Sequence, residues 1–402
     1  MRKPSKLVIF LTVFIDLVGF GIVLPLLPIY SKNLGASGFA IGAIMAAYSA
    51  MQFLFAPLWG RLSDRIGRRP VLLVSIAGSA VSYGIFAYGS TLAGNAGLVV
   101  LLISRILAGI GGANISVAQA YIADITPPEG RSKAMGLIGM AFGLGFIFGP
   151  AIGAFALSKF GIQGPGWMAA AFCAFDLILA FFILGESWTP SATPAAQRPR
   201  VQQWFHTLAQ PKVGLLIILF FLATFAFTCF ETTLGLLVAR NFKLDAGKAE
   251  DAKAIGYLFA YCGIIGAFVQ GGAIGRAVKK MGEPRLIALS LLLTAVSLAL
   301  LPFALDWTAV LIALAILAIG SSLARPPIFG MISILTAAHE QGATIGVAQS
   351  VGSLARIAGP IFAAMLFDVD PKIPYLACAV ISLLAAVLTW MKLCQTSPAA
   401  QA

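Results

Sequence analysis

Residues 60–70 read GRLSDRIGRRP and join two long apolar stretches, residues 38–60 and 70–90. A helix of about 20 apolar residues crosses the hydrocarbon core of a bilayer, and both stretches have that length. Gly60 and Gly67 permit a tight turn between them. This part of the sequence therefore predicts a hairpin of two membrane-spanning helices joined by a short charged loop.

The same alternation of apolar and charged stretches continues along the chain. Hydrophobic residues make up 59% of its 402 residues and charged residues only 10%, with a mean hydropathy of +0.94. Soluble domains carry roughly 25% charged residues, which excludes that class. Backbone groups in lipid must be satisfied within each segment, so the segments are helices. We predict an all-α integral membrane protein with twelve transmembrane helices, at residues 7–30, 38–60, 70–90, 97–123, 133–157, 166–186, 213–239, 254–275, 285–304, 307–333, 343–367 and 373–392.

The positions of Lys and Arg predict the orientation. With the N-terminus inside, seventeen of them fall in cytoplasmic segments and seven in outer loops. Cytoplasmic loops carry the excess of basic residues, so we expect both termini in the cytoplasm. The expected location is the inner (plasma) membrane of a bacterium, and an organelle membrane is the alternative. The net charge of +12 then anchors the chain against anionic lipid, and we expect no nucleic-acid partner. Cysteines and histidines show no metal-ligand or catalytic spacing, which predicts no metal, no cofactor and no enzyme activity.

An internal repeat divides the chain into two halves. Residues 60–67 match residues 275–282, and Gly149-Pro150 matches Gly359-Pro360. Chance similarity between glycine-rich segments is the alternative, but charge and turn positions match as well. Repeats of six helices around a midplane cavity build many secondary transporters. We predict an N-terminal six-helix bundle, a polar cytoplasmic linker and a C-terminal six-helix bundle at residues 1–186, 187–212 and 213–402.

Few acidic residues lie inside the spans. Asp16 in the first helix and Glu231 in the seventh are mates under the repeat. A charge at the bilayer centre costs about 2.5–3.5 kcal/mol, so such residues face a cavity or the bundle interior. A carboxyl group in low dielectric binds a proton more readily, which predicts proton coupling by both acids. A structural carboxyl bonded to a neighbouring helix is the alternative, and it is the favoured reading for the isolated Asp176.

A polar stripe marks the fourth helix. Arg105, Gly109, Gly112, Ser116 and Gln119 recur at spacings of four and three, which places them on one helical face. We expect Arg105 to join in proton coupling as the partner of a carboxylate or of an anionic substrate; a packing face with one buried ion pair is the alternative. The expected substrate cavity combines both acids with six further side chains, namely Arg105, Gln119, Arg325, Arg356, Tyr257 and Tyr261.

Residues 60–70 resemble the signature of the major facilitator superfamily between its second and third helices. In similar transporters this loop forms an ion-pair network that latches the cytoplasmic gate. The resemblance implies that Asp64 pairs with Arg68 and across to Asp124 or Arg131; a simple basic anchor would leave Asp64 and its flanking glycines unexplained. The implied gating network comprises Gly60, Asp64, Arg65, Gly67, Arg68, Asp124 and Arg131.

Three more stretches resemble motifs of this superfamily. Residues 105–112 resemble the helix-four motif, whose arginine is implicated in proton transfer, and residues 16–28 resemble the first-helix motif of twelve-span drug:proton antiporters. Residues 145–153 resemble the helix-five motif of antiporters, with Gly145, Gly149, Pro150 and Gly153. Tetracycline exporters are similar in residues 121–126 as well. They carry acids where this chain has Ser82 and Thr294 and a histidine near Gly266, so recognition of a metal–tetracycline chelate is not implied.

The sequence thus predicts a proton-coupled antiporter that exports small amphipathic organic molecules by alternating access. The buried acids favour cationic or zwitterionic substrates, whereas Arg105 would equally suit an anion. A proton-coupled importer or symporter is the main alternative, and a non-transporting membrane receptor is a second one. The expected partners are a small-molecule substrate, protons and the lipid bilayer, and the chain is expected to act as a monomer in drug efflux and antibiotic resistance.

Overall fold

The computed structural model describes residues 3–23, 26, 27, 30, 31, 34–36, 38–189, 200–243 and 249–395. Within these residues, twelve helices are long and apolar enough to cross a membrane, so the predicted all-α fold with twelve spans is confirmed. Parts of two predicted segments lie outside the described residues: four positions near the end of the first span, and residues 190–199 of the linker.

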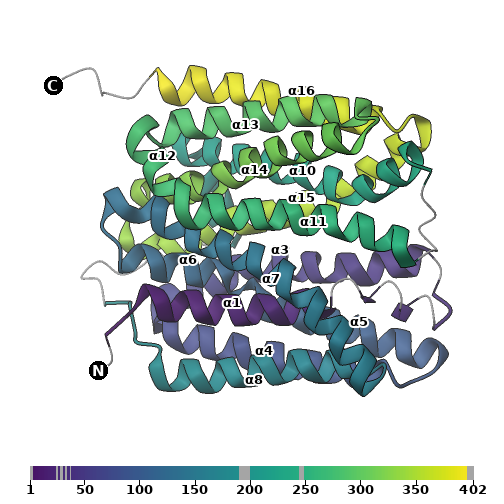
Figure 1. Cartoon of the computed structure of the whole chain (residues 1–402). Helices are drawn as coiled ribbons and strands as arrows, with labels where there is room; N and C mark the ends of the chain where they lie inside the picture. The colour runs from purple at the N-terminus through teal and green to yellow at the C-terminus, as the bar shows by residue number, and fades with distance from the viewer. Residues whose placement is uncertain are drawn as a thin grey trace.

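The first six spans form one group of helices (Figure 1). The predicted loop 60–70 is instead helical except at Gly67, because the helix of the second span continues to Ile66 and that of the third begins at Arg68. The fourth span is interrupted by a 3₁₀ turn, η1 (Gly112–Asn114). The helices are α1 (Lys6–Val23), α3 (Gly38–Ile66), α4 (Arg68–Gly89), α5 (Gly94–Gly111) with α6 (Ile115–Asp124), α7 (Arg131–Phe160) and α8 (Gly164–Ile183).

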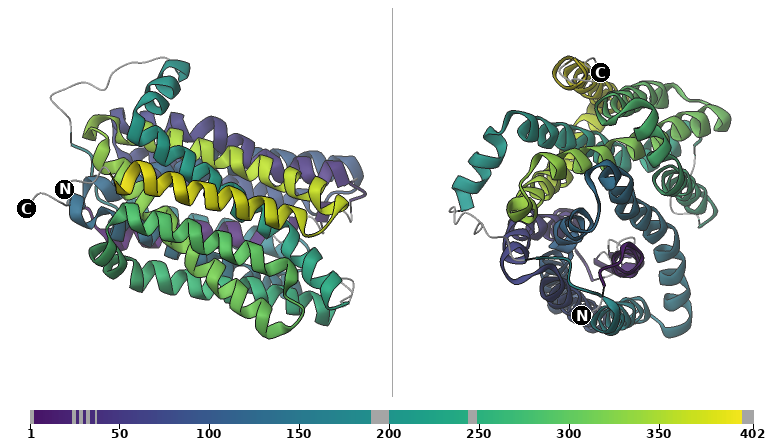
Figure 2. Two further views of the ribbon diagram at one scale, coloured as in Figure 1. Left: turned by 90° about the horizontal axis from the view of Figure 1, so that it is seen from above. Right: turned by 90° about the vertical axis from the view of Figure 1, so that its left-hand side faces the viewer.

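The last six spans form the second group, and the two groups are seen end-on in Figure 2. A π-helical turn, η3 (Val269–Ala273), interrupts the eighth span, and another, η6 (Trp390–Cys394), ends the twelfth. α1 begins and η6 ends at the same end of the bundle, which we call the terminal end (Figure 1). The helices are α10 (Pro211–Asn241), α11 (Ala249–Phe268) with α12 (Ile274–Met281), α13 (Glu283–Leu300), α14 (Trp307–Leu335), α15 (Gln341–Val369) and α16 (Ile373–Thr389).

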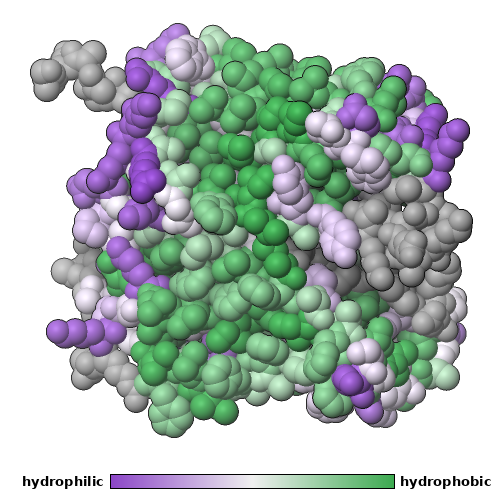
Figure 3. All heavy atoms as spheres, in the orientation of Figure 1, coloured by the Kyte–Doolittle hydropathy of each residue, from purple (hydrophilic) through white to green (hydrophobic). Residues whose placement is uncertain are grey.

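On the face seen in Figure 3, a broad apolar band lies between two more polar ends. Large side chains such as Phe175 and Phe182 on α8 and Leu384 on α16 are more than half exposed. Soluble monomers rarely expose apolar patches of this extent. These side chains are placed to contact lipid, because the helices already satisfy the backbone groups of the spans.

The predicted linker contains a short helix, α9 (Arg200–Ala209), which packs against α10 and α15. The Trp204 ring lies 5.5 Å from the ring of Phe53 on α3. His206 and His339 both approach the Glu340 carboxylate, at 3.9 and 4.0 Å. Both histidines therefore lie beside one carboxylate at the start of α15.

Candidate functional site

A cavity of about 1450 Å³ lies between the two groups of helices. Ligand pockets usually measure roughly 300–1,000 Å³, so this one has room for a large organic molecule. Its wall is rich in aromatic rings, contributed by Phe20, Phe142, Phe220, Phe227, Phe230 and Phe259. Its charged lining residues are Asp16, Arg105, Glu231, Arg325 and Arg356. The cavity thus brings together all five charged residues that were predicted to line it.

Asp16 lies on α1 and is 7% exposed. Its carboxyl group accepts long contacts from Asn114 Nδ2 at 3.4 Å and Cys173 Sγ at 3.8 Å. No Lys or Arg nitrogen of the described residues lies within ion-pair distance of it. With weak neutral partners and an opening to the cavity, this carboxyl can take up and release a proton.

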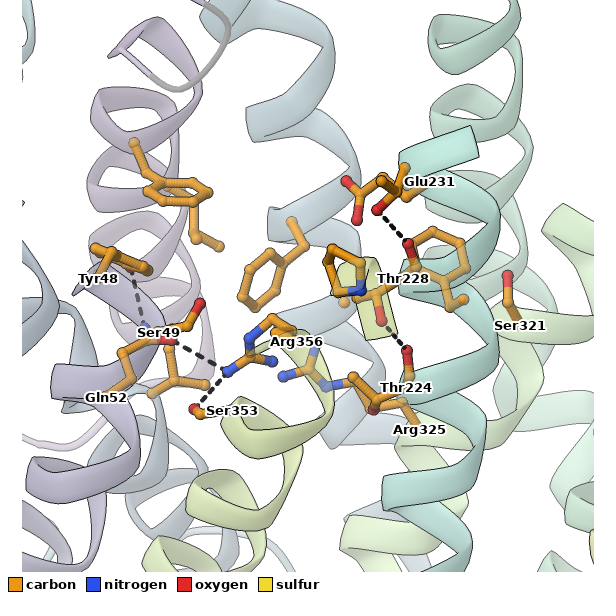
Figure 4. A pocket seen from close by; sticks show the side chains of 18 of the residues that line it. Tyr48, Ser49, Gln52, Thr224, Thr228, Glu231, Ser321, Arg325, Ser353 and Arg356 are labelled. Atoms are coloured by element: carbon orange, nitrogen blue, oxygen red, sulfur yellow. Dashed lines mark hydrogen bonds between the residues drawn. The ribbon is translucent and has the colours of Figure 1, made fainter. Parts of the chain in front are cut away.

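Glu231 lies on α10, and its exposed side chain faces the cavity (Figure 4). Within the described part of the chain, its carboxyl group has neither a hydrogen-bond nor an ion-pair partner. Arg356 is near enough to attract it electrostatically, without forming a direct pair. One available acid therefore comes from each half of the repeat, and both face the same space.

Asp176 on α8 is completely buried, and neither of its carboxyl oxygens has a hydrogen-bond partner. It is close enough to Asp16 for the two carboxyl groups to repel each other when both are ionised. An ionised carboxylate without a partner is unfavourable in such a place. We therefore expect Asp176 to be an uncharged acid behind Asp16.

Replacing Asp176 with Asn tests this state. A neutral acid and an amide have nearly the same shape, so the free energy of unfolding is expected to change by no more than about 1 kcal/mol. The thermal midpoint of the purified protein measures this change. An ionised Asp176 would instead make Asn clearly stabilising, because an uncompensated buried charge costs several kcal/mol. A rise of several degrees in the midpoint would contradict the uncharged state.

Arg105 lies on α5 and is 1% exposed. None of its three guanidinium nitrogens has a hydrogen-bond partner. Its guanidinium carbon instead lies 5.6 and 5.4 Å from the ring centroids of Tyr83 and Phe86. The expected carboxylate partner is replaced by two aromatic faces, which attract a cation through their electron density.

Arg325 and Arg356 extend from α14 and α15 into the same part of the cavity (Figure 4). Arg356 Nη2 donates to Gln52 Oε1 at 3.1 Å and to Ser353 Oγ at 2.8 Å. Arg325 Nη2 makes only a long contact with Gln349 Oε1 at 3.4 Å, and its Nε has no acceptor. Both cations are therefore held by neutral groups alone.

Asp64 connects the two halves at the terminal end. Its Oδ1 lies 2.5 Å from Arg68 Nη1, and Arg68 Nε lies 3.0 Å from Asp124 Oδ2. The same carboxylate accepts the backbone N–H groups of Gly342 (3.0 Å) and Ala343 (2.8 Å) at the start of α15. A helix N-terminus offers free N–H groups and a positive dipole end, so a carboxylate is well placed there.

The other predicted gating residues take different places. A Cβ atom on Gly60 would collide with the carbonyl oxygen of Gly342, so this glycine lets α3 and α15 touch. Arg131 does not contact Asp64; its Nη1 donates to the carbonyl of Ser333 at 2.7 Å. Arg65 is exposed and takes no part in this network. Gly67 has φ of 101°, which favours glycine at the turn between α3 and α4.

The glycines of residues 145–153 pack α7 against α1. A Cβ atom added to any of the three would come too close to the backbone of α1. The distances would be 2.5 Å from Gly149 to Gly21, 3.0 Å from Gly145 to Leu17, and 2.7 Å from Gly153 to the carbonyl oxygen of Ile22. Pro150 lines the cavity on the same helix. This motif therefore holds the helix that carries Asp16 close to α7.

Replacing Gly149 with Ala is expected to destabilise the protein by about 1–3 kcal/mol, because α1 must move away from α7. The matched control is Gly78→Ala on α4, where an added methyl group meets nothing within 4 Å. Thermal unfolding in detergent measures both variants. Equal midpoints for the two would contradict the close approach of α1 and α7.

Three predicted cavity residues do not line the cavity. On α11 the lining residues share one side of the helix, namely Gly256, Phe259, Ala260, Cys262, Gly263 and Gly266. Tyr257 and Tyr261 lie beside that face: Tyr257 is 71% exposed and Tyr261 packs against the apolar core around Phe230. Gln119 lies one layer behind the wall, where its Oε1 accepts Gln349 Nε2 at 2.8 Å.

Two side chains that connect parts of the site, Gln52 and Glu186, were not predicted from the sequence. Gln52 joins both halves, because its amide nitrogen donates to Tyr48 Oη and the Gly112 carbonyl while its oxygen accepts Arg356. Glu186 accepts the N–H groups of Arg68 and Arg69 at the start of α4, at 2.9 and 3.1 Å. The position of Gln52 two turns before Gly60, within an apolar span, was the available signal.

Comparisons with known proteins agree with this architecture. The family model of the Major Facilitator Superfamily matches residues 9–274 and 271–401. The chain is 34% identical to the class E tetracycline resistance protein of Escherichia coli (89% of this chain, 86% of the relative) and 31% identical to multidrug resistance protein 1 of Bacillus subtilis (96% of each). The predicted resemblance to tetracycline exporters is therefore confirmed.

Solved structures show the same fold. The human organic anion transporter MFSD10 superposes with a TM-score of 0.82 at 26% identity, over 96% of this chain and all of that one. The proton:xylose symporter XylE superposes with a TM-score of 0.75 at 16% identity, over 96% and 94% of the two chains, and supports the fold alone. The expectation of a transporter rather than an enzyme is confirmed, and the chain belongs to the major facilitator superfamily.

Proposed function

We propose that this transporter exports small amphipathic organic molecules in exchange for protons. The observation that carries the proposal is that Asp16 and Glu231, one from each half of the repeat, face one large aromatic-lined cavity. Relatives over nearly the whole chain are named for resistance to tetracycline and to multiple drugs, which supports drug efflux and antibiotic resistance.

Alternating access provides the coupling in this proposal. The six-helix units of residues 1–186 and 213–402, joined by residues 187–212, rock around the cavity. In this proposal the hydrogen bonds between Asp64 and the start of α15 hold the terminal end closed. Asp16 and Glu231 take up protons from the acidic side and release them on the other, and the positive charge of Arg105 in the cavity wall favours release.

The terminal end is proposed to face the cytoplasm of a bacterial cell, with the chain in the inner membrane as a monomer. The basic stretch 60–70 lies at this end, as the excess of Lys and Arg on the cytoplasmic side requires. The apolar band in Figure 3 would then contact the lipid.

A second candidate function is cotransport of an anion with protons. Arg325 and Arg356 favour it, because both cations lack a carboxylate partner within the described residues. The human transporter with this fold is described as an organic anion transporter. Protonating Glu231 would remove a negative charge that repels an anion near Arg356, so a simple anion and a proton would bind together and move in the same direction.

Transport in proteoliposomes separates the two candidates. A pH gradient is imposed across the membrane, and movement of cationic, zwitterionic and anionic dyes is followed. Exchange predicts dye movement against the proton flow, whereas cotransport predicts movement with it. Dye movement in the direction of the protons would contradict the proposed export.

A further inference from the structure

The two cavity arginines are incompletely satisfied. Arg325 and Arg356 are near enough to repel each other, and their hydrogen bonds reach only amide and hydroxyl oxygens. The Arg325 guanidinium lies 4.8 and 5.5 Å from the ring centroids of Phe142 and Phe220, which hold it in an apolar wall. Uncompensated cations in such surroundings are unfavourable, so this place is suited to an anionic group.

Glu231 provides the opposite charge in the same space. Its carboxyl group extends from α10 above the two guanidinium groups (Figure 4). It is exposed to the cavity and has no direct partner in the described residues, so a cationic group can reach it. The cavity therefore offers two separated sites of opposite charge between phenylalanine rings.

We propose that the substrates are amphipathic zwitterions, with an anionic group on Arg325 and Arg356, a cationic group on Glu231 and an apolar body between the rings. This inference rests on the proposed export function and specifies its substrate class. Arginine suits a carboxylate in particular, because its planar guanidinium can form two parallel hydrogen bonds with the two oxygens.

Neither simple charge class satisfies this arrangement. A purely cationic molecule would leave the two arginines unpaired and would be repelled by them. A purely anionic molecule would be repelled by the Glu231 carboxylate, and its binding would favour proton uptake rather than proton release. A zwitterion pairs with both sites, and a proton arriving at Glu231 displaces its cationic group, which is the competition that exchange requires.

Three dyes with one ring system test the inference. Rhodamine 110 carries a carboxylate and a cationic xanthene, rhodamine 123 is its methyl ester and only cationic, and fluorescein has oxygen in place of the amino groups and is anionic. Binding to the purified full chain in detergent is measured by fluorescence polarisation. We expect rhodamine 110 to bind roughly tenfold or more tightly than the other two, as charge-assisted hydrogen bonds imply.

Variants assign the two charges to their sites. Arg356→Gln and Arg325→Gln are each expected to remove the advantage of rhodamine 110 over rhodamine 123, and Arg356→Lys should keep part of it. Glu231→Gln should remove the advantage over fluorescein. Arg276→Gln, which changes an exposed arginine on α12 outside the cavity, is the matched control and should change no affinity.

Two results would overturn the inference: equal binding of all three dyes, or an arginine variant that weakens all three equally while its thermal midpoint is unchanged. Because the binding assay contains no pH gradient, it reports the substrate class independently of proton exchange. A failure of exchange in liposomes would therefore contradict the proposed function without changing this result.

Discussion

Removing both cavity acids, by Asp16→Asn and Glu231→Gln, is expected to reduce gradient-driven substrate accumulation to the level of liposomes without protein. Each coupled proton that crosses about 100 mV supplies about 2.3 kcal/mol, which sustains roughly a 50-fold concentration ratio. Without a carboxyl group that can exchange a proton in the cavity, that free energy cannot reach the substrate. The double variant should then equilibrate the substrate without concentrating it.

Single variants and a counterflow assay refine this result. Asp16→Asn and Glu231→Gln alone should each lower the accumulation ratio, and exchange of labelled for unlabelled substrate without a gradient should continue in Asp16→Asn. The matched control is Asp368→Asn, the same change at an exposed acid near the end of α15 outside the cavity. If the double variant still concentrates substrate when a pH gradient is imposed, neither acid is a coupling residue.

The charged part of the site was accessible from the sequence because charge in a membrane is costly. Asp16, Arg105, Glu231, Arg325 and Arg356 stood out within apolar spans, and the structure places all five around the cavity. The same cost predicts that each needs a cavity or a partner, without identifying the partner. The stacking of Arg105 on two aromatic rings, in place of a carboxylate, therefore appears only in the structure.

Neutral side chains and the backbone were harder to predict. Tyr257 and Tyr261 are each next to a cavity-lining residue of α11 in the sequence, and so they point to another side of the helix. Their aromatic character did not reveal this, because an aromatic ring is stable against lipid as well as in a cavity. The second partner of Asp64 is the backbone of α15, and backbone N–H groups carry no sequence signal. The repeat predicted that the halves meet, but the contacting residues depend on helix packing.

Replacing Asp64 with Asn is expected to open the terminal end of the protein. The aspartate pairs with the buried Arg68 and also accepts two N–H groups of α15 across the halves, whereas an amide offers one acceptor and no charge. Breaking a buried pair on one side costs about 3–5 kcal/mol. If most of that cost falls on the closed state, the balance between the two states shifts by about a hundredfold or more.

Spin labels at Glu129→Cys and Lys279→Cys report this opening, because both exposed positions lie at the terminal end, in the first and second group of spans respectively. The two half-buried native cysteines, Cys262 and Cys394, are replaced by Ser to prevent their labelling. Distances from double electron–electron resonance should lengthen in Asp64→Asn and stay unchanged in Asp368→Asn. Transport should fall steeply at the same time, since a protein held open at one end cannot alternate. An unchanged distance distribution in Asp64→Asn would mean that the contact of Asp64 with α15 does not hold the halves together, and that the helix-to-helix approach at Gly60 closes this end alone.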